Sequence, residues 1–225
     1  MITSLPLYIT VVFIITVLLT LALFVKAVNH KVIVAVISVA WLILTGALAY
    51  NGFYKDTNRL PPNFLLAIVP APLAIILLFT TKSGRGFIDN INLRSITILN
   101  VVRIPVELVL YWLSVNKAVP ELMTFTGSNF DIFSGLTAPV MYFVCFKGKF
   151  VTKPKILLVW NFICLALLLN VVVRGILSAP LPFQKIAFSQ PNIAVLYFPF
   201  VWLPCFIVMA VLLSHLTSIR RLLIQ

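Results

Sequence analysis

Long apolar runs separated by short polar gaps dominate the chain. Most of them approach the length of about 20 residues that an α-helix needs to cross the hydrocarbon core of a bilayer. Seven such runs can be placed, at residues 5–25, 32–49, 64–80, 96–115, 131–146, 156–174 and 193–213. The fifth is short, and the residues before it read as a partly inserted approach. The pattern predicts an all-α polytopic membrane protein, a single transmembrane domain of about seven helices.

Composition excludes a soluble domain. Of the 225 residues, 62% are hydrophobic and 10% are charged, and the mean hydropathy is +1.13. The net charge of +12 does not indicate nucleic acid, because the basic residues fall in the gaps between apolar runs. The first run lacks the basic start and cleavage site of a signal peptide, so it is expected to be a permanent span. The predicted partner is the lipid bilayer, and the sequence leaves the oligomeric state open.

The distribution of lysine and arginine predicts an orientation. The gaps after the first, third, fifth and seventh runs hold eleven basic residues, and the N-terminus and the other gaps hold four. Because basic residues are retained on the cytoplasmic side, the C-terminus is expected inside and the N-terminus outside. The expected location is a bacterial inner membrane. Residues 86–95 are expected to form a short interfacial helix on the cytoplasmic face.

A weak internal repeat is present at a constant offset of 129 residues. It pairs Lys26 with Lys155, Gly46 with Gly175, Pro62 with Pro191 and Pro70 with Pro199. The matches predict two parallel triplets of spans joined by the fourth, a 3+1+3 layout that resembles the SWEET sugar transporters in architecture alone. The alternative is that apolar sequences align here by chance.

The fourth run carries a polar stripe. Its members fall within about 60° on a helical wheel, and they are Asn100, Arg103, Glu107, Tyr111 and Ser114. An ionised side chain near the bilayer centre costs about 2.5–3.5 kcal/mol, so the stripe is expected to face other helices or a watery cavity. Arg103 and Glu107, spaced i and i+4, can neutralise each other. Pro105 between them predicts a kink.

Residues 120–139 form the second unusual stretch. Polar side chains alternate here with Met123 and three phenylalanines, which indicates a structured cap rather than a solvated linker. The polar members are Glu121, Thr124, Thr126, Ser128, Asn129 and Asp131. Asp131 is placed to be the N-cap of the fifth helix. We expect Arg103 and Glu107 to share one polar network with this cap, which must then dip into the membrane.

These two stretches carry a resemblance. The patterns R-x-P-x-E and P-x-x-M-T-F-x-G-x-N-F-D-I-x-x-G-L-x-A resemble a group of uncharacterised bacterial integral membrane proteins. The resemblance covers about a sixth of the chain and implies no activity. The matching residues are Arg103, Pro105, Glu107, Pro120, Met123, Thr124, Phe125, Gly127, Asn129, Phe130, Asp131, Ile132, Gly135, Leu136 and Ala138.

The sixth run adds polar residues near the outer surface. Asn170 and Arg174 are spaced i and i+4. Either they line the same outward-facing cavity as the fourth run, or the side chain of Arg174 extends to the lipid headgroups. Asn161 is expected to make a packing hydrogen bond. The candidate substrate-binding residues are thus Asn100, Arg103, Glu107, Tyr111, Glu121, Thr124, Thr126, Asn129, Asp131, Asn170 and Arg174.

Several chemistries have no support. There is no H-E-x-x-H, G-x-S-x-G or phosphate-binding loop, and the seventh run has no lysine for a retinal Schiff base. His30 and His215 read as interfacial residues without a ligand spacing, and the three cysteines read as packing residues. We therefore expect no metal and no cofactor, and we assign no catalytic residue.

Three functions fit these observations. The first is an outward-facing polar cavity that transports or binds a small solute. The second is a membrane-embedded enzyme with Glu107 as acid or base on a lipid-like or isoprenoid substrate. The third is a structural or signalling subunit of a membrane complex. The Arg103 and Glu107 pair is compatible with all three, because it can also serve only to hold helices together.

Overall fold

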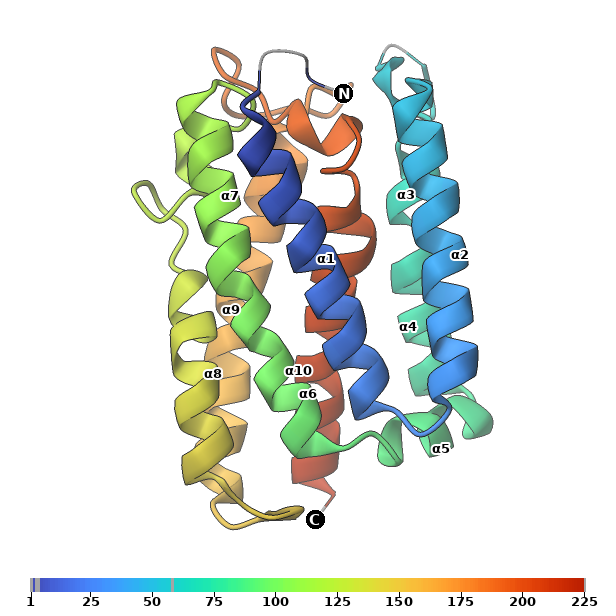
Figure 1. Cartoon of the computed structure of the whole chain (residues 1–225), viewed down its shortest axis with the longest axis vertical. Coiled ribbons are helices and arrows are strands. Elements are labelled where there is room, and N and C mark those ends of the chain that lie inside the picture. Colours follow the sequence, from blue (N-terminus) through green and yellow to red (C-terminus); the bar gives the residue numbers. More distant parts are fainter. Residues whose placement is uncertain (1, 3–4, 58, 225) are drawn as a thin grey trace.

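A bundle of long helices makes up the computed structural model, which describes residues 2, 5–57 and 59–224 (Figure 1). One small hairpin of two strands joins α8 to α9. The α-helices are α1 (Leu7–Ala27), α2 (Lys31–Tyr50), α3 (Leu65–Ile68), α4 (Pro70–Thr80), α5 (Lys82–Asp89), α6 (Leu93–Leu99), α7 (Arg103–Val115), α8 (Ile132–Val144), α9 (Pro154–Ser178) and α10 (Val208–Leu223). The shorter elements are η1 (Phe53–Lys55), η2 (Asn100–Val102), η3 (Glu121–Met123), β1 (Phe146–Lys147), β2 (Phe150–Val151), η4 (Ala194–Leu196) and η5 (Leu203–Ile207).

Within the described residues, five helices are long and apolar enough to cross a bilayer: residues 7–27, 31–50, 93–115, 154–178 and 203–223. A sixth crossing results if α3 to α5, bent by 93°, counts as one broken span. Helix α8 is apolar but has only 13 residues. The chain is therefore an all-helical protein with five or six helices of membrane-spanning character. The predicted count of seven additionally requires the short α8 to cross.

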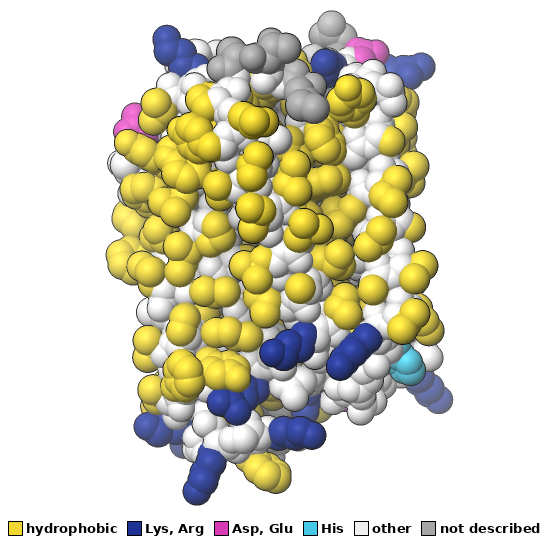
Figure 2. Space-filling model, viewed as in Figure 1, with side chains coloured by type: hydrophobic (Ala, Val, Ile, Leu, Met, Phe, Trp, Pro, Cys, Tyr) yellow, Lys and Arg dark blue, Asp and Glu magenta, His cyan; other side chains and the backbone are white. Residues whose placement is uncertain are grey.

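The side of the bundle is apolar, and its two ends are not. Figure 2 shows hydrophobic side chains along the whole length of the visible face and basic side chains gathered at the lower end. Helix α1 begins at the upper end of the bundle and α10 ends at the lower end, which is the end with the basic cluster (Figures 1 and 2). Many large hydrophobic side chains on the flanks are exposed; Val32, for example, has an exposed fraction of 77%. This distribution is typical of a protein whose flanks contact lipid.

The last span begins ten residues later than the seventh apolar run predicts. Residues 203–223 form it, whereas the run covers 193–213. Two prolines explain the shift, because each lacks a backbone N–H and disfavours a helical conformation for the residue before it. Pro191 and Pro199 leave only the single 3₁₀ turn of η4 before the π-helical start at η5, which tolerates Pro204 in its first turn.

The helix predicted at residues 86–95 also starts earlier than expected. Helix α5 covers residues 82–89, because Thr81 caps it by accepting a hydrogen bond from the backbone N–H of Gly84 at 3.1 Å. Gly84 lies directly on the preceding helix: a Cβ here would be 2.5 Å from the Leu78 backbone. Glycine thus permits the sharp bend that lays α5 across the base of the bundle (Figure 1).

Pro105 perturbs the fourth span without breaking it. The turn before it is the 3₁₀ segment η2, and Pro105 has no backbone N–H to donate to the carbonyl of Val101 four residues earlier. Helix α8 then crosses α7 closely, since a Cβ on Gly135 would lie 2.9 Å from Cγ1 and 3.0 Å from the backbone nitrogen of Ile104. The non-helical cap packs beside α7, where Phe125 stacks on Tyr111. The predicted 3+1+3 repeat remains a prediction, because α8 is shorter than its counterpart α1.

Candidate functional site

Arg103 forms a buried ion pair with the cap. Its Nη1 lies 3.0 Å from Oδ1 of Asp131, and the two side chains are 3% and 6% exposed. The same guanidinium donates to the carbonyl of Cys164 on α9 at 3.4 Å. Two predictions are corrected here. Asp131 does not cap α8 through its side chain, and the described residues show no ion pair between Arg103 and Glu107. The cap instead supplies Arg103 and Glu107 with separate partners.

Glu107 is held by Asn129. The amide Nδ2 of Asn129 donates to both carboxylate oxygens, at 2.7 and 2.9 Å. Two backbone groups fix the orientation of this amide: Nδ2 also donates to the carbonyl of Met123 at 2.9 Å, and Oδ1 accepts from the N–H of Asp131 at 2.9 Å. Asn129 therefore presents a donor to Glu107. Arg103 and Glu107 thus both contact the cap, as the sequence predicts. Arg103 contacts Asp131 and Glu107 contacts Asn129, instead of contacting each other.

The cap is rigid because it is internally bonded. The hydroxyl of Thr124 donates to the carbonyl of Glu121 at 2.9 Å and lies 2.7 Å from the hydroxyl of Thr126. A Cβ on Gly127 would lie 2.3 Å from the carbonyl oxygen of Glu121, so only glycine fits there. Phe125 stacks on Tyr111 of α7 with the ring centroids 5.2 Å apart. These contacts fix the depth at which Asn129 and Asp131 enter the bundle.

The cluster holds two carboxyl groups and one guanidinium. Arg103, Glu107 and Asp131 are 2%, 1% and 4% exposed. If all three were ionised, the buried cluster would carry one net negative charge, which is costly at membrane depth. Neutrality requires one further proton or cation. Glu107 is the carboxyl group without a cationic partner, so it is the group placed to carry that proton.

The remaining candidates fall into three places. Asn170 and Arg174 support the cap from α9: Asn170 donates to the carbonyl of Ser128 at 3.1 Å and accepts from Nε of Arg174 at 2.9 Å. Glu121 and Thr126 are on the outside of the cap and exposed. Asn100 lies deeper, in another cluster, where it donates to Oγ of Ser214 at 3.1 Å.

His215 belongs to that deeper cluster, and its predicted interfacial position is wrong. It is fully buried, with Nδ1 2.8 Å from Oδ1 of Asn161. Because Nδ2 of Asn161 donates to the carbonyl of Leu157 at 2.8 Å, its Oδ1 faces the ring and Nδ1 carries the proton. The ring also packs edge-on against Trp160, 5.8 Å between centroids. The later start of the last span moves His215 from its end to its middle. The sequence signal for this was the run of polar residues at 214, 215, 217 and 218.

The two clusters are one helical turn apart. Asn161, the partner of His215, precedes Cys164 by three residues on α9, and the carbonyl of Cys164 accepts from Arg103. On the fourth span, Asn100 precedes Arg103 by the same interval. Polar contacts therefore continue from the cap through the centre of the bundle to α10.

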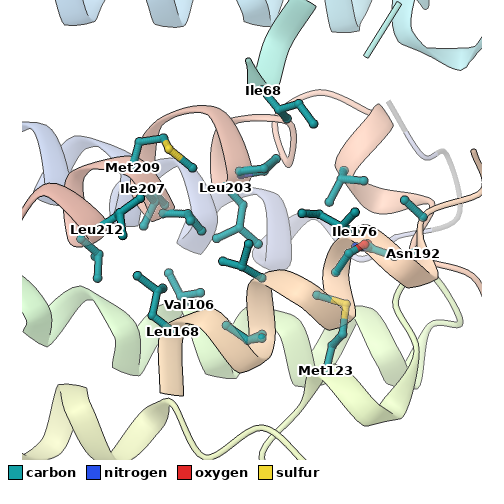
Figure 3. A pocket seen from close by; sticks show the side chains of 18 of the residues that line it. Ile68, Val106, Met123, Leu168, Ile176, Asn192, Leu203, Ile207, Met209 and Leu212 are labelled. Atoms are coloured by element: carbon teal, nitrogen blue, oxygen red, sulfur yellow. The ribbon is translucent and has the colours of Figure 1, made fainter. Parts of the chain in front are cut away.

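A cavity of about 420 Å³ includes Arg103, Glu107 and Asp131 in its wall. Figure 3 shows other side chains that line it. Its walls come from α3 and α4 on one side, α7 and α9 on another, and η5 with α10 on the third. The lining is apolar, as Figure 3 shows for Ile68, Val106, Leu168 and Leu212. Arg103, Glu107, Asp131 and Asn192 are the exceptions in the wall. The cavity thus lacks the polar character that the stripe on the fourth span predicts.

The cavity opens sideways, toward the apolar flank of the bundle. Its rim includes Val69, Leu73 and Ile176, which are 42%, 52% and 44% exposed. Along α9 and its C-cap it extends from Leu168 to Ala179, about 16 Å at the helical rise of 1.5 Å per residue. That length is close to half of the roughly 30 Å hydrocarbon core. The length of the cavity is therefore comparable to the thickness of one leaflet, and it lies on the side of the bundle that carries the cap.

No protein family model, curated protein or solved structure matches the chain. The resemblance to uncharacterised bacterial membrane proteins remains a prediction. Among residues 2, 5–57 and 59–224, no group of three metal-ligating acidic, histidine or cysteine side chains is close enough to hold a metal ion.

Proposed function

We propose that this chain is a seven-span inner-membrane protein that binds a lipid-like molecule in the laterally open cavity between α4 and α9. The observation that carries the proposal is the meeting of an apolar, leaflet-deep cavity with the buried carboxyl group of Glu107. The hydrocarbon chain of the ligand would lie along α9. Its polar group would reach Glu107 or, at the outer end, the unpartnered Oδ1 of Asn192.

The cavity walls favour an apolar ligand over a small polar solute. A polar solute would lose its hydration in this space and find few groups to replace it. A hydrocarbon or isoprenoid chain that enters from the membrane has no hydration to lose. The exposed rim at Leu73 and Ile176 offers it an entrance. Solute binding in an outward-facing polar cavity, the first function that the sequence supports, is therefore the weaker hypothesis.

Glu107 gives the proposed site its chemistry. Asn129 donates to both of its oxygens and fixes the carboxyl group at the cavity wall. The ion pair of Arg103 with Asp131 sets the local field without engaging Glu107 directly. A group held in this way can exchange a proton with a bound ligand, as an acid or base in an enzyme or as a coupling group in a carrier.

Transport is the second candidate, and one observation favours it. The polar contacts continue past the cavity from Arg103 to Asn161 and His215, in the direction of the opposite face. A binding protein or enzyme needs no such continuation. A carrier that moves a proton with its ligand would use it.

The proposed orientation can be tested with reporter fusions. Eleven basic residues on one side of the membrane predict a cytoplasmic C-terminus and an outside N-terminus. A reporter that is active only in the cytoplasm should therefore be active when fused after residue 224 and inactive when fused in the loop at residues 56–60. Activity of a periplasmic reporter at the C-terminal fusion would contradict the seven-span arrangement.

A matched pair of substitutions on α9 tests the ligand. Val172 lines the cavity, whereas its neighbour Val173 is 51% exposed on the lipid-facing flank. Val172→Trp should fill part of the cavity and lower the amount of lipid-like molecule that co-purifies in native mass spectrometry by about tenfold, the effect of 1.4 kcal/mol. Val173→Trp should leave it unchanged. Equal retention in both variants would argue against the cavity as the binding site.

A further inference from the structure

A second apolar groove lies on the other side of α4. It has a volume of about 850 Å³ and is bounded by α1 and α2, by α4, and by α10 with η5. It reaches deep into the bundle, since its floor includes Cys205, Phe206 and Ala210, which are 1%, 7% and 5% exposed. Met209 lines both this groove and the first cavity. Helix α4 is thus flanked by open apolar space on two sides.

Helix α2 is fastened to the bundle by its outer half. Trp41 donates from Nε1 to the carbonyl of Cys205 at 3.2 Å, and Trp202 donates to the carbonyl of Leu42 at 2.9 Å. The other half of α2 forms one wall of the groove through residues that include Ile33 and Ile37, which remain 60% and 63% exposed. The groove is therefore open to the surrounding membrane along the half of α2 that precedes Trp41.

Basic groups surround the end of this groove at the base of the bundle. His30 lines it, Lys26 lies in the last turn of α1, and Lys31 is the first residue of α2. The amphipathic α5, whose Phe87 also lines the groove, adds Lys82 and Arg85. Figure 2 shows basic side chains gathered at this end of the molecule.

The acidic residue nearest in sequence does not neutralise this group. Asp89, at the end of α5, is already paired with Arg220, whose Nε lies 3.2 Å from its Oδ1. The mouth of the groove therefore keeps an excess of positive charge. An anion is the complementary partner.

We propose that the groove holds one phospholipid with a negatively charged headgroup, taken from the leaflet on the basic side. An apolar space at membrane depth is filled by hydrocarbon, because neither water nor a void is favourable there. An acyl chain would lie against η5 and α10, and the headgroup would lie among Lys31, Lys82 and His30. This site is separate from the cavity beside Glu107 and does not depend on its proposed function.

The test is lipid retention after reconstitution into equal amounts of phosphatidylglycerol and phosphatidylcholine, followed by native mass spectrometry in mild detergent. One phosphatidylglycerol should remain bound per chain, in preference to phosphatidylcholine. The double substitution Lys31→Gln with Lys82→Gln should reduce that preference by about thirtyfold, as expected for two lysines near the headgroup. The matched control is Lys55→Gln with Lys117→Gln, two lysines at the other end of the bundle, which should change nothing.

A second pair of variants separates charge from packing. Ile37→Trp should fill the groove and remove the bound lipid whatever its headgroup, whereas Ile43→Trp, on a 66% exposed position outside the groove, should not. Equal retention of the two lipids, equal effects of the two lysine pairs, or full retention in Ile37→Trp would each overturn the proposal. The thermal unfolding of each variant, measured in detergent, identifies any that fail to fold.

Discussion

Asp131→Leu is expected to lower the free energy of unfolding by about 3–5 kcal/mol, because it leaves the guanidinium of Arg103 buried without its counter-charge. The ion pair is 3.0 Å long and both side chains are almost completely buried. Removing both charges in Arg103→Leu with Asp131→Leu should recover a large part of that loss, since no uncompensated charge remains. Unfolding in mixed micelles measures all three variants.

The control for this prediction is the ion pair at the base of the bundle. Arg220 and Asp89 are 28% and 39% exposed, so Arg220→Leu should cost no more than about 1 kcal/mol. Double-mutant cycles then measure the coupling energy of Arg103 with Asp131 and with Glu107. The coupling energy with Asp131 should exceed the coupling energy with Glu107. A larger coupling with Glu107 would restore the simple i and i+4 pair that the sequence predicts.

Asn129→Asp should destabilise the protein nearly as much as Asp131→Leu, although the asparagine and aspartate side chains have the same shape. The change removes the donor that serves Glu107 and the carbonyl of Met123, and each buried group left unpaired costs about 1–3 kcal/mol. It also places a third carboxyl group beside two others. We expect a loss of more than about 3 kcal/mol in the free energy of unfolding, together with loss of ligand retention.

Asn170→Asp is the matched comparison. It loses one bond to the carbonyl of Ser128 but gains a charged partner in Arg174, so a change of about 1 kcal/mol or less is expected. Adding Glu107→Gln to Asn129→Asp returns a donor to that contact and should recover part of the stability. If Glu107→Gln lowered the free energy of unfolding of Asn129→Asp further, Asn129 would not be the partner that holds Glu107.

Local patterns in the sequence predict several of the long helices and the buried polar contacts of Arg103 and Glu107 with the cap. The apolar runs place α1, α2 and α9 because a span must be continuous and apolar. The stripe on the fourth span marks Arg103 and Glu107 because polar side chains recurring on one helix face cannot contact lipid. The alternation of polar and aromatic residues marks the cap that supplies Asn129 and Asp131.

The pairings inside the site depend on distances that local patterns do not contain. Glu107 and Asn129 are 22 residues apart, and their contact depends on how far the cap dips beside α7. The i and i+4 rule compares Arg103 only with its own helix and so favours Glu107 over Asp131. The prediction for His215 is wrong because hydropathy alone does not show that Pro191 and Pro199 delay the last span. The apolar cavity arises between α4 and α9, which no single segment reveals.

The most direct test of a lipid-like ligand beside Glu107 is an experimental density map of the protein in native lipid, free of detergent. Continuous, elongated density should occupy the cavity of about 420 Å³ and run along α9 from Ala179 to Leu168. One end of it should lie within hydrogen-bonding distance of Glu107 or Asn192. A map in which α4 packs directly against α9, or in which only water occupies the space beside Glu107, would contradict the proposed function.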